Sequence, residues 1–275
     1  MGYGSARRAV VLGAAVACLL ALAPPAAAQS GQLPSPGISP PGANDFSCRP
    51  SPAHPHPVVL VHGTFLDMTT GWNLISPLLK SKGYCVFALD YGGRGTGPIE
   101  DSAAELSRFV DRVLEATDAR RVAIVGQSQG GMMPRWYVKN LDGPHTVSEI
   151  VGLVPSNHGT TQPLTDVVGL ACFACLQQKA GSEFIQALNA ADETPGPVDY
   201  TQITTRLDEV VTPFRSAFLE GPGTTNVLVQ DKCPLDVFEH VGIVYDPVAI
   251  QWVVNALGRP GPADPGFKPR CLLVL

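Results

Sequence analysis

The chain has 275 residues, of which 45% are hydrophobic and 16% are charged, and its formal net charge is −5 at pH 7. This mildly acidic balance argues against a nucleic-acid partner and against a polybasic membrane-binding patch. The length suits one α/β domain with a sizeable buried core.

The first 28 residues have the pattern of a secretory signal peptide. Arg7 and Arg8 precede the apolar run 9–23, and Ala26-Ala27-Ala28 offers an A-x-A cleavage site. The run is too short and wrongly flanked for a spanning helix, with an uncleaved N-terminal anchor as the alternative. Cleavage near Ala28 predicts a secreted, extracellular protein with 17 basic and 24 acidic residues, a net charge of −7.

Cysteine usage agrees with export. Six of the seven cysteines lie beyond the signal peptide, and an even number suggests three disulfides whose pairing the spacing leaves open. Cys172 and Cys175 form a C-x-x-C motif, which could be redox-active or half of a zinc site. Because no second C-x-x-C and no histidine pair at ligand spacing follows, we favour a local structural bridge and expect no metal.

Strand-like and helix-like segments alternate along most of the chain. Residues 29–56 are rich in Pro, Gly and Ser and predict a solvated, irregular arm tied down at Cys48. Beyond it, the alternation predicts a mostly parallel central sheet with helices on both faces, in one α/β catalytic domain over 57–275. Strands are expected at 57–61, 84–89, 122–125, 150–154, 200–204 and 226–229, and helices at 72–80, 103–116, 131–140 and 247–257.

The third predicted strand ends in Gly126-Gln127-Ser128-Gln129-Gly130, which reads G-x-S-x-G. Glycine is common in this chain, so the pentapeptide alone is weak evidence. A strand that ends in this motif and opens into a helix is, however, typical of the nucleophile elbow of the α/β-hydrolase fold. The context therefore predicts that fold, with Ser128 as the nucleophile.

The connection over 155–197 is longer than most connections in α/β domains. It contains an apolar piece, 167–176. One interpretation is an extra core helix stapled by the C-x-x-C motif. The other is a cap or rim segment around an acyl pocket, since long insertions are often functional.

A serine hydroxyl needs a base, and the base needs an orienting acid. In α/β-hydrolases these follow in the order Ser, then Asp or Glu, then His. His240 is the only histidine after the last predicted strand and before the final helix. Asp208 follows the penultimate strand and is the favoured acid, with Glu209 as the neighbouring alternative.

The negative oxygen of an acyl-transfer intermediate needs preorganised donors. One donor is the backbone N–H of the residue after the nucleophile, Gln129. The other is expected in the loop after the first strand, where Thr64 could offer its backbone N–H and its hydroxyl. His62, at the start of that loop, is expected to be structural.

On these motifs the chain resembles α/β-hydrolase lipases, namely the bacterial class 2 lipases and the Candida antarctica lipase B family. The resemblance to class 2 lipases lies in 57–64 and 107–143. The resemblance to the lipase B family lies in the elbow with Trp136, in Gly63-Thr64, 177–178, 181–182 and 208–213, and in the spacing of Cys233, His240 and Cys271.

Carried over by position, the resemblance implies Ser128 as nucleophile, Asp208 as acid and His240 as base, with Thr64 and Gln129 as oxyanion donors. It also implies the disulfides Cys48–Cys85 and Cys233–Cys271, which leaves Cys172 to pair with Cys175. Two positions depart from the pattern. His62 replaces a proline, as in the bacterial branch, and Asn157 stands at an acidic pocket position, as a candidate substrate-binding residue.

These observations predict a secreted serine lipase or carboxylesterase that hydrolyses acylglycerols or other carboxylic esters through an acyl-enzyme on Ser128. The mechanism requires no cofactor or metal, and we expect a monomer whose partner is its lipid or ester substrate. An acyltransferase or a polyester depolymerase would use the same residues and is the first alternative. A non-catalytic hydrolase-like binding protein is the second.

Overall fold

Six parallel strands form the central sheet of the computed structural model, which describes residues 1–2 and 37–271. Apart from its first two residues, the expected signal peptide lies outside this part of the chain. Each strand pairs in parallel with its neighbours, as predicted. The order is β2-β1-β3-β4-β5-β6. The strands span β1 Val58–Val61, β2 Val86–Leu89, β3 Val122–Gln127, β4 Val147–Leu153, β5 Asp199–Thr204 and β6 Thr224–Leu228.

The strand order reverses between β1 and β3. After β1 the chain moves outward to β2, and it then returns to the other side of β1 and adds β3 to β6 in sequence. In open α/β sheets, ligands bind in the crevice outside the carboxyl ends of the strands at such a reversal. The loops that follow β1 and β3 carry Thr64 and Ser128, so both candidates lie at this crevice.

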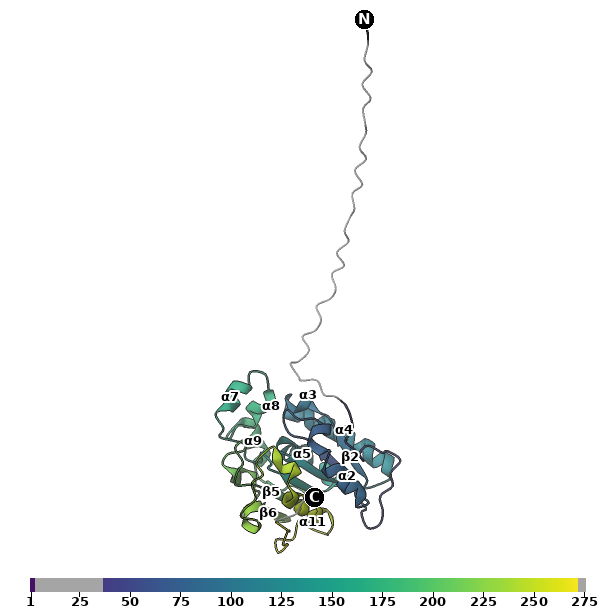
Figure 1. The fold of residues 1–275 in the computed structure, drawn as a ribbon, viewed down its shortest axis with the longest axis vertical. Helices are drawn as coiled ribbons and strands as arrows, with labels where there is room; N and C mark the ends of the chain where they lie inside the picture. The colour runs from purple at the N-terminus through teal and green to yellow at the C-terminus, as the bar shows by residue number, and fades with distance from the viewer. Residues whose placement is uncertain (3–36, 272–275) are drawn as a thin grey trace.

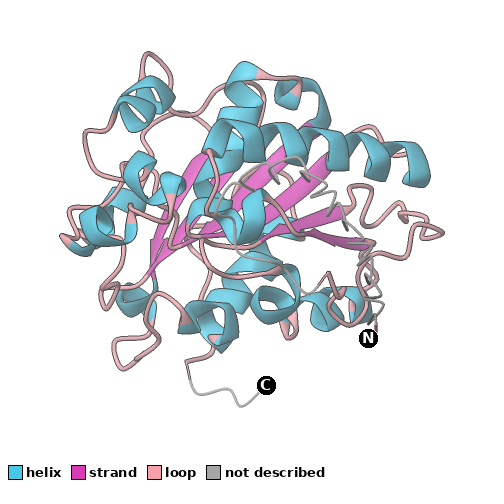
Figure 2. Cartoon of the chain, turned by 90° about the horizontal axis from the view of Figure 1, so that it is seen from above, coloured by secondary structure: helices cyan, strands magenta, loops and turns pink. Residues whose placement is uncertain are grey.

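Helices cover both faces of the sheet (Figures 1 and 2). One face packs against α4, α5 and α9, and the other against α1, α2 and α11. The central strands β1 and β3 are fully buried, which explains their unbroken apolar runs. The helices are α1 Met68–Trp72, α2 Ile75–Ser81, α3 Gly92–Gly95, α4 Ile99–Thr117, α5 Gln129–Asn140, α6 Gly143–Thr146, α7 Leu164–Val168, α8 Phe173–Gln177, α9 Glu183–Asn189, α10 Val229–Lys232 and α11 Pro247–Leu257, with 3-10 turns η1 Phe214–Ala217 and η2 Gly242–Tyr245. None of the helices between residues 37 and 271 has the length and apolar character needed to cross a membrane.

The predicted helix 72–80 is two helices, α1 and α2. The carboxylate of Asp67 accepts a hydrogen bond from the Thr70 backbone N–H at 2.8 Å and starts α1 early. The helix predicted at 103–116 also begins earlier, at Ile99, directly after Pro98. Local capping residues therefore set boundaries that hydrophobic periodicity alone does not mark.

The described part of the N-terminal arm, 37–56, is irregular but packs against the sheet. The side chain of Asn44 accepts from the Ala88 N–H and donates to the Ala88 carbonyl, both at 2.9 Å. Phe46 packs against Phe87 of β2 with the rings tilted and their centroids 5.1 Å apart. The arm is therefore irregular and mostly solvent-exposed, and it also covers the edge of β2 and protects that edge from pairing with other chains.

The structure contains three disulfides, Cys48–Cys85, Cys172–Cys175 and Cys233–Cys271. These are the pairs that the resemblance implies. The first ties the arm to the start of β2, and the last ties the C-terminal segment to the end of α10. Structural disulfides of this kind persist in oxidising compartments.

Each of the two interpretations of the long connection 155–197 applies to one part of it. Helix α9 buries Phe184, Ile185 and Leu188 in the core beside α5. Helix α7 buries no residue and lies near α8 at one end of the molecule, at the upper left of Figure 1. One part of the connection is therefore core, and the other is an exposed rim.

Glu149 of β4 is a largely buried carboxyl group at the amino-terminal edge of the sheet. It lies in register with Asp199 of β5, and its Oε2 has no hydrogen-bond partner among residues 37–271. Burial, assisted by the negative charge of Asp199, raises the pKa of Glu149 to about 8. Near neutral pH the carboxyl therefore stays largely protonated in the folded chain.

Glu149→Gln should change how stability depends on pH. The folded-state pKa of Glu149 lies above its ordinary value of 4.5, so its contribution to stability is complete below that value and is lost as pH rises toward about 8. Each pH unit in this window costs up to about 1.4 kcal/mol. The melting temperature of Glu149→Gln should match that of the wild type near pH 4, exceed it increasingly up to about pH 8, and then stay above it by a nearly constant amount. Glu115→Gln, at an exposed position of α4, is the control, and its melting temperature should follow that of the wild type at every pH. If the melting temperatures of Glu149→Gln and the wild type differed by the same amount at every pH, the raised pKa of Glu149 would be contradicted.

Candidate active site

Ser128 lies between the end of β3 and the start of α5, in a strained turn. Its backbone has φ 55° and ψ −122°, a conformation that side-chain-bearing residues rarely adopt. Its N–H donates to the carbonyl of Leu153 at 2.8 Å, which fixes the turn to the neighbouring strand. The turn holds the serine side chain at the carboxyl edge of the sheet, as expected for a nucleophile elbow.

The two glycines of the motif are required by close backbone contacts. A Cβ on Gly126 would lie 1.8 Å from the Gly130 carbonyl oxygen, and one on Gly130 would lie 2.1 Å from the Val61 carbonyl oxygen. These distances are shorter than any non-bonded contact, so no other residue fits at either position. The first turn of α5 is therefore packed directly against the end of β1.

His240 and Asp208 form a buried hydrogen-bonded pair. His240 Nδ1 lies 2.9 and 3.0 Å from the two carboxylate oxygens of Asp208. The same carboxylate accepts from the backbone N–H groups of Val210 and Val211 at 3.0 and 2.7 Å. Asp208 thus orients the imidazole and leaves its Nε2 free for other partners.

Ser128 and His240 line one cavity of about 510 Å³ at the carboxyl edge of the sheet. Three segments contribute most of its apolar wall, namely the loop after β1, helix α7 and the loop after β5. Along α7 and just beyond it, Leu164, Val167 and Leu170 are 64%, 68% and 92% exposed. The mouth of the cavity is therefore bordered by an exposed apolar rim. The apolar residues that line the cavity are Phe65, Leu66, Leu164, Val168, Val210, Val211 and Val241.

Thr64 and Gln129, the two candidate oxyanion donors, are held together beside Ser128. The Thr64 hydroxyl donates to Gln129 Oε1 at 2.6 Å, and Gln178 Nε2 donates to both groups, at 3.0 and 3.2 Å. Ser156 in turn donates to Gln178 Oε1 at 2.8 Å. Within residues 37–271, the backbone N–H groups of Thr64 and Gln129 donate to no protein acceptor. Both amides are therefore available to a ligand oxygen.

Gln178 is part of the resemblance to the lipase B family, but the sequence predicts no role for it. The structure places it at the end of α8, where its amide joins the loop after β1 to the first residue of α5. No local pattern distinguishes it from Gln177, whose side chain accepts from the Ile99 N–H at 2.8 Å. Only the three-dimensional arrangement separates the two glutamines.

His62 is structural, as its place in the sequence suggested. It is fully buried and stacks on Tyr91 with ring centroids 4.4 Å apart. Its Nδ1 donates to the Gly63 carbonyl at 2.8 Å, and burial lowers the pKa of the imidazole below its ordinary value. A neutral imidazole therefore supports the loop that carries Thr64.

Asn157 does not line the cavity of Ser128. Its side chain is fully buried, donates to the carbonyl of Ala217 at 2.7 Å and accepts from Arg135 at 3.3 Å. Arg135 of α5 is also fully buried and donates to the Glu193 carbonyl at 3.0 and 2.9 Å. Burial lowers the pKa of Arg135 to about 10. Asn157 thus belongs to a buried polar network behind the site, and no sequence pattern predicts its contact with Arg135.

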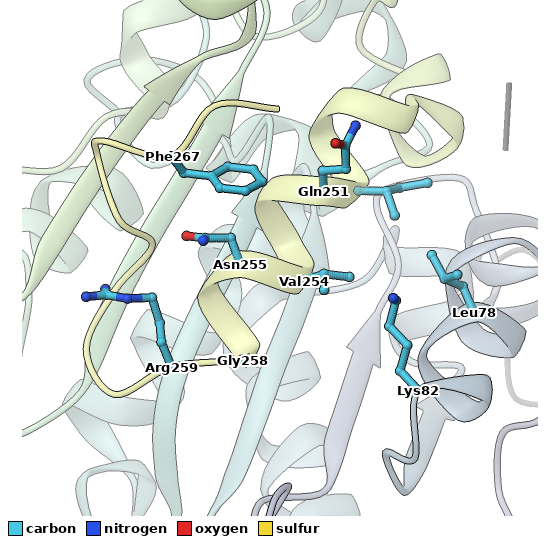
Figure 3. A pocket seen from close by; sticks show the side chains of 9 residues that line it. Leu78, Lys82, Gln251, Val254, Asn255, Gly258, Arg259 and Phe267 are labelled. Atoms are coloured by element: carbon cyan, nitrogen blue, oxygen red, sulfur yellow. The ribbon is translucent and has the colours of Figure 1, made fainter. Parts of the chain in front are cut away.

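A second cavity, of about 430 Å³, lies away from the candidate residues. It is formed between α2 and α11, and Figure 3 shows Leu78 and Lys82 on one side and Gln251, Val254 and Asn255 on the other. Neither Ser128 nor His240 contributes to it. Between residues 37 and 271, no group of three or more His, Cys, Asp or Glu side chains could hold a metal ion.

Comparisons with known proteins identify the family of the chain. Residues 55–253 match the model of the family described as Lipase (class 2). The chain is 31% identical over 116 residues to a triacylglycerol lipase of Pseudarthrobacter phenanthrenivorans, and equally to one of Burkholderia plantarii. Each alignment covers 36% of this chain, and it covers 36% and 32% of those two proteins, so the chain matches about a third of the length of either relative.

Solved structures share the fold. The crystal structure of Aspergillus fumigatus lipase B superimposes with a TM-score of 0.72 at 25% identity, covering 83% of this chain and 57% of that chain. Bacillus licheniformis lipase BlEst2 in its propeptide form gives a TM-score of 0.62 at 15% identity, covering 85% of this chain and 55% of that chain, and supports the fold alone. The predicted α/β-hydrolase fold is thereby confirmed.

Gly130→Ala should disrupt the elbow, because its new methyl group would lie 2.1 Å from the Val61 carbonyl oxygen. We expect a loss of about 1–3 kcal/mol or more in the free energy of unfolding and loss of labelling of Ser128 by a fluorophosphonate probe. Gly71→Ala is the matched control. Its added Cβ would meet nothing closer than 3.5 Å, in helix α1, so stability and labelling should be retained. Wild-type behaviour of Gly130→Ala would contradict the close packing of α5 on β1.

Proposed function

Since the chain belongs to the class 2 lipase family, we propose that it is a secreted serine lipase or carboxylesterase that hydrolyses acylglycerols or related carboxylic esters. The observation that carries the proposal is the His240–Asp208 pair on the same cavity as a serine in a strained elbow. Structural groups rarely combine a strained serine, a carboxylate-oriented imidazole and an apolar cavity.

The proposed reaction begins when Ser128 Oγ attacks the ester carbonyl and His240 Nε2 accepts its proton. Asp208 holds the Nδ1–H and stabilises the imidazolium that forms. The backbone N–H groups of Thr64 and Gln129 donate to the negative oxygen of the tetrahedral intermediate. Collapse of the intermediate releases the alcohol, which takes the proton from His240 and leaves an acyl-enzyme. Water activated by the same histidine then releases the carboxylic acid.

The walls of the cavity support a substrate with an apolar acyl group. Leu164 and Val168 of α7 and Val210 and Val211 of the loop after β5 line it and offer no hydrogen-bonding side chain. Burying a hydrocarbon chain against such surface is favourable, at about 0.8 kcal/mol per methylene. The two aligned relatives are triacylglycerol lipases, which supports acylglycerols as the substrate class.

The signal-peptide pattern and the three disulfides support secretion as part of the proposal. The mildly acidic charge supports a protein without a nucleic-acid partner. A monomer that requires neither metal nor cofactor remains our expectation, because the proposed chemistry uses only side chains and backbone amides of one chain.

Ser128→Ala should abolish ester hydrolysis, because no other group on the cavity would form the acyl-enzyme. The measurement is the rate of p-nitrophenyl ester hydrolysis by Ser128→Ala and by the wild type. A second experiment compares the rates at which the wild type hydrolyses emulsified long-chain triglyceride, soluble short-chain esters and solid polyester. Preference for the triglyceride is the expected result, whereas preference for polyester would favour a depolymerase. Substantial activity in Ser128→Ala would refute the serine mechanism.

Asp208→Asn and Glu209→Gln should separate the two acid candidates. Asp208 contacts His240 Nδ1, whereas Glu209 is exposed and its backbone carbonyl accepts from Gln162 at 2.8 Å. We expect Asp208→Asn to lower kcat by a factor on the order of 10³–10⁴, because the amide cannot hold the productive imidazole tautomer. Glu209→Gln should stay within a few-fold of the wild type. The reverse ranking would assign the acid to Glu209.

A further inference from the structure

The segment that carries His240 has little backbone or hydrophobic support of its own. Residues 233–241 connect α10 to η2 without helix or strand, and Leu235 and Val237 are 89% and 73% exposed. Side-chain packing therefore does not fix this segment along most of its length. Its position must come from other contacts.

Side-chain donors from the end of β3, from the residue after β5 and from α10 hold three carbonyl groups of the segment. Gln230 Nε2 donates to the Asp236 carbonyl at 3.3 Å, Thr205 Oγ1 to that of Phe238 at 2.8 Å, and Gln127 Nε2 to that of His240 at 3.1 Å. The segment is therefore attached to the carboxyl ends of β3 and β5 and to α10.

Gln127 differs from Gln230 in how its amide is used. Gln230 Oε1 accepts from the Arg206 N–H at 2.9 Å, and its Nε2 also donates to Thr205 Oγ1 at 2.8 Å. By contrast, Gln127 Oε1 is buried and has no donor among residues 37–271. This oxygen lies so close to the Gly63 backbone that a Cβ on Gly63 would be 2.0 Å from it.

A buried amide oxygen without a donor lowers stability, and an apolar side chain of similar size would avoid that loss. The Gln127 amide therefore costs stability at one end, while its other end makes a single hydrogen bond, to the backbone of His240. Because a carbonyl can only accept, this bond also fixes which end of the amide is the nitrogen. Gln127 also lines the cavity of Ser128, but within residues 37–271 the one hydrogen bond of its amide goes to the residue that carries the base.

We propose that Gln127 is a positioning residue, which ties the backbone of His240 to the strand end that carries Ser128. This inference rests on the proposed serine mechanism. Asp208 fixes the imidazole at Nδ1, and Gln127 fixes the backbone from which the imidazole projects. Because Gln127 directly precedes Ser128, nucleophile and base share one rigid support. A displacement of about 1 Å at such a site can cost on the order of 10²-fold in rate.

Gln127→Met tests this role, since methionine keeps the size of the side chain but removes both amide groups. We expect kcat to fall about 10- to 100-fold. KM should stay within about twofold of the wild type, because Gln127 lines the cavity and methionine fills a similar volume of its wall. The melting temperature should be unchanged or higher, because the unpaired oxygen is gone. A fluorophosphonate probe should still label Ser128 completely, but more slowly by a factor similar to the loss in kcat.

Gln202→Met is the matched control. Gln202 is also a buried strand glutamine with one amide bond, accepted from Asn157 at 3.1 Å, and its Nε2 has no partner among residues 37–271. It makes no hydrogen bond to the His240 segment within that range, so its kcat and labelling rate should match those of the wild type.

Three results would count against these assignments, and they are distinguishable. Wild-type kcat and labelling rate in Gln127→Met would overturn the positioning role alone. A fall in kcat accompanied by an equal rise in KM and a lower melting temperature would make Gln127 a purely structural residue and would also overturn it. Failure of the wild-type protein to be labelled at Ser128 would instead refute the serine mechanism on which the inference rests.

Discussion

The close approach of α5 to the ends of β1 and β3 is the constraint on which the rest of the site depends. The Gly130 Cα lies against the Val61 carbonyl, and Gly126 lies against the Gly130 carbonyl, so the backbone has no room for side chains. This contact forces Ser128 into its positive-φ conformation and brings the first turn of α5 beside the loop that carries Thr64. The strain is sustained because two buried central strands, β1 and β3, hold both sides of the turn.

Around this turn, side chains rather than backbone ladders connect the loops. Gln178 joins the loop after β1 to α5, Gln127 joins β3 to the His240 segment, and Arg135 joins α5 to the loops that carry Asn157 and Glu193. Parallel strands end at a common edge, where their loops have no partner strand to pair with, so buried amides and a guanidinium supply the missing hydrogen bonds. Such networks fix one arrangement of the loops because each unmatched partner would be costly.

The sequence predicts the sheet well because its signals are local. Runs such as Val58–Val61 and Val122–Gln127 are apolar and β-branched, and all six predicted strands are present. The elbow is predicted from its pentapeptide, and chain order with strand position favours Asp208 and His240, which the structure brings into contact. The roles of Gln178 and Arg135 and the burial of Asn157 depend on partners 22 to 114 residues away. No spacing rule in one sequence encodes contacts of that kind.

The exposed rim at α7 has a structural explanation in the packing of α9. Within the connection 155–197, α9 supplies the core packing, because it buries three apolar side chains against α5 and the sheet. Helix α7 is therefore free of any packing role, and it is short enough to need no buried face of its own. Leu164 and Val168 meet the cavity instead, while Val167 faces solvent. The exposure of this apolar rim costs stability locally and does not weaken the core beneath it. The buried strands thus hold Ser128 in place, while the rim of its cavity carries no part of the core.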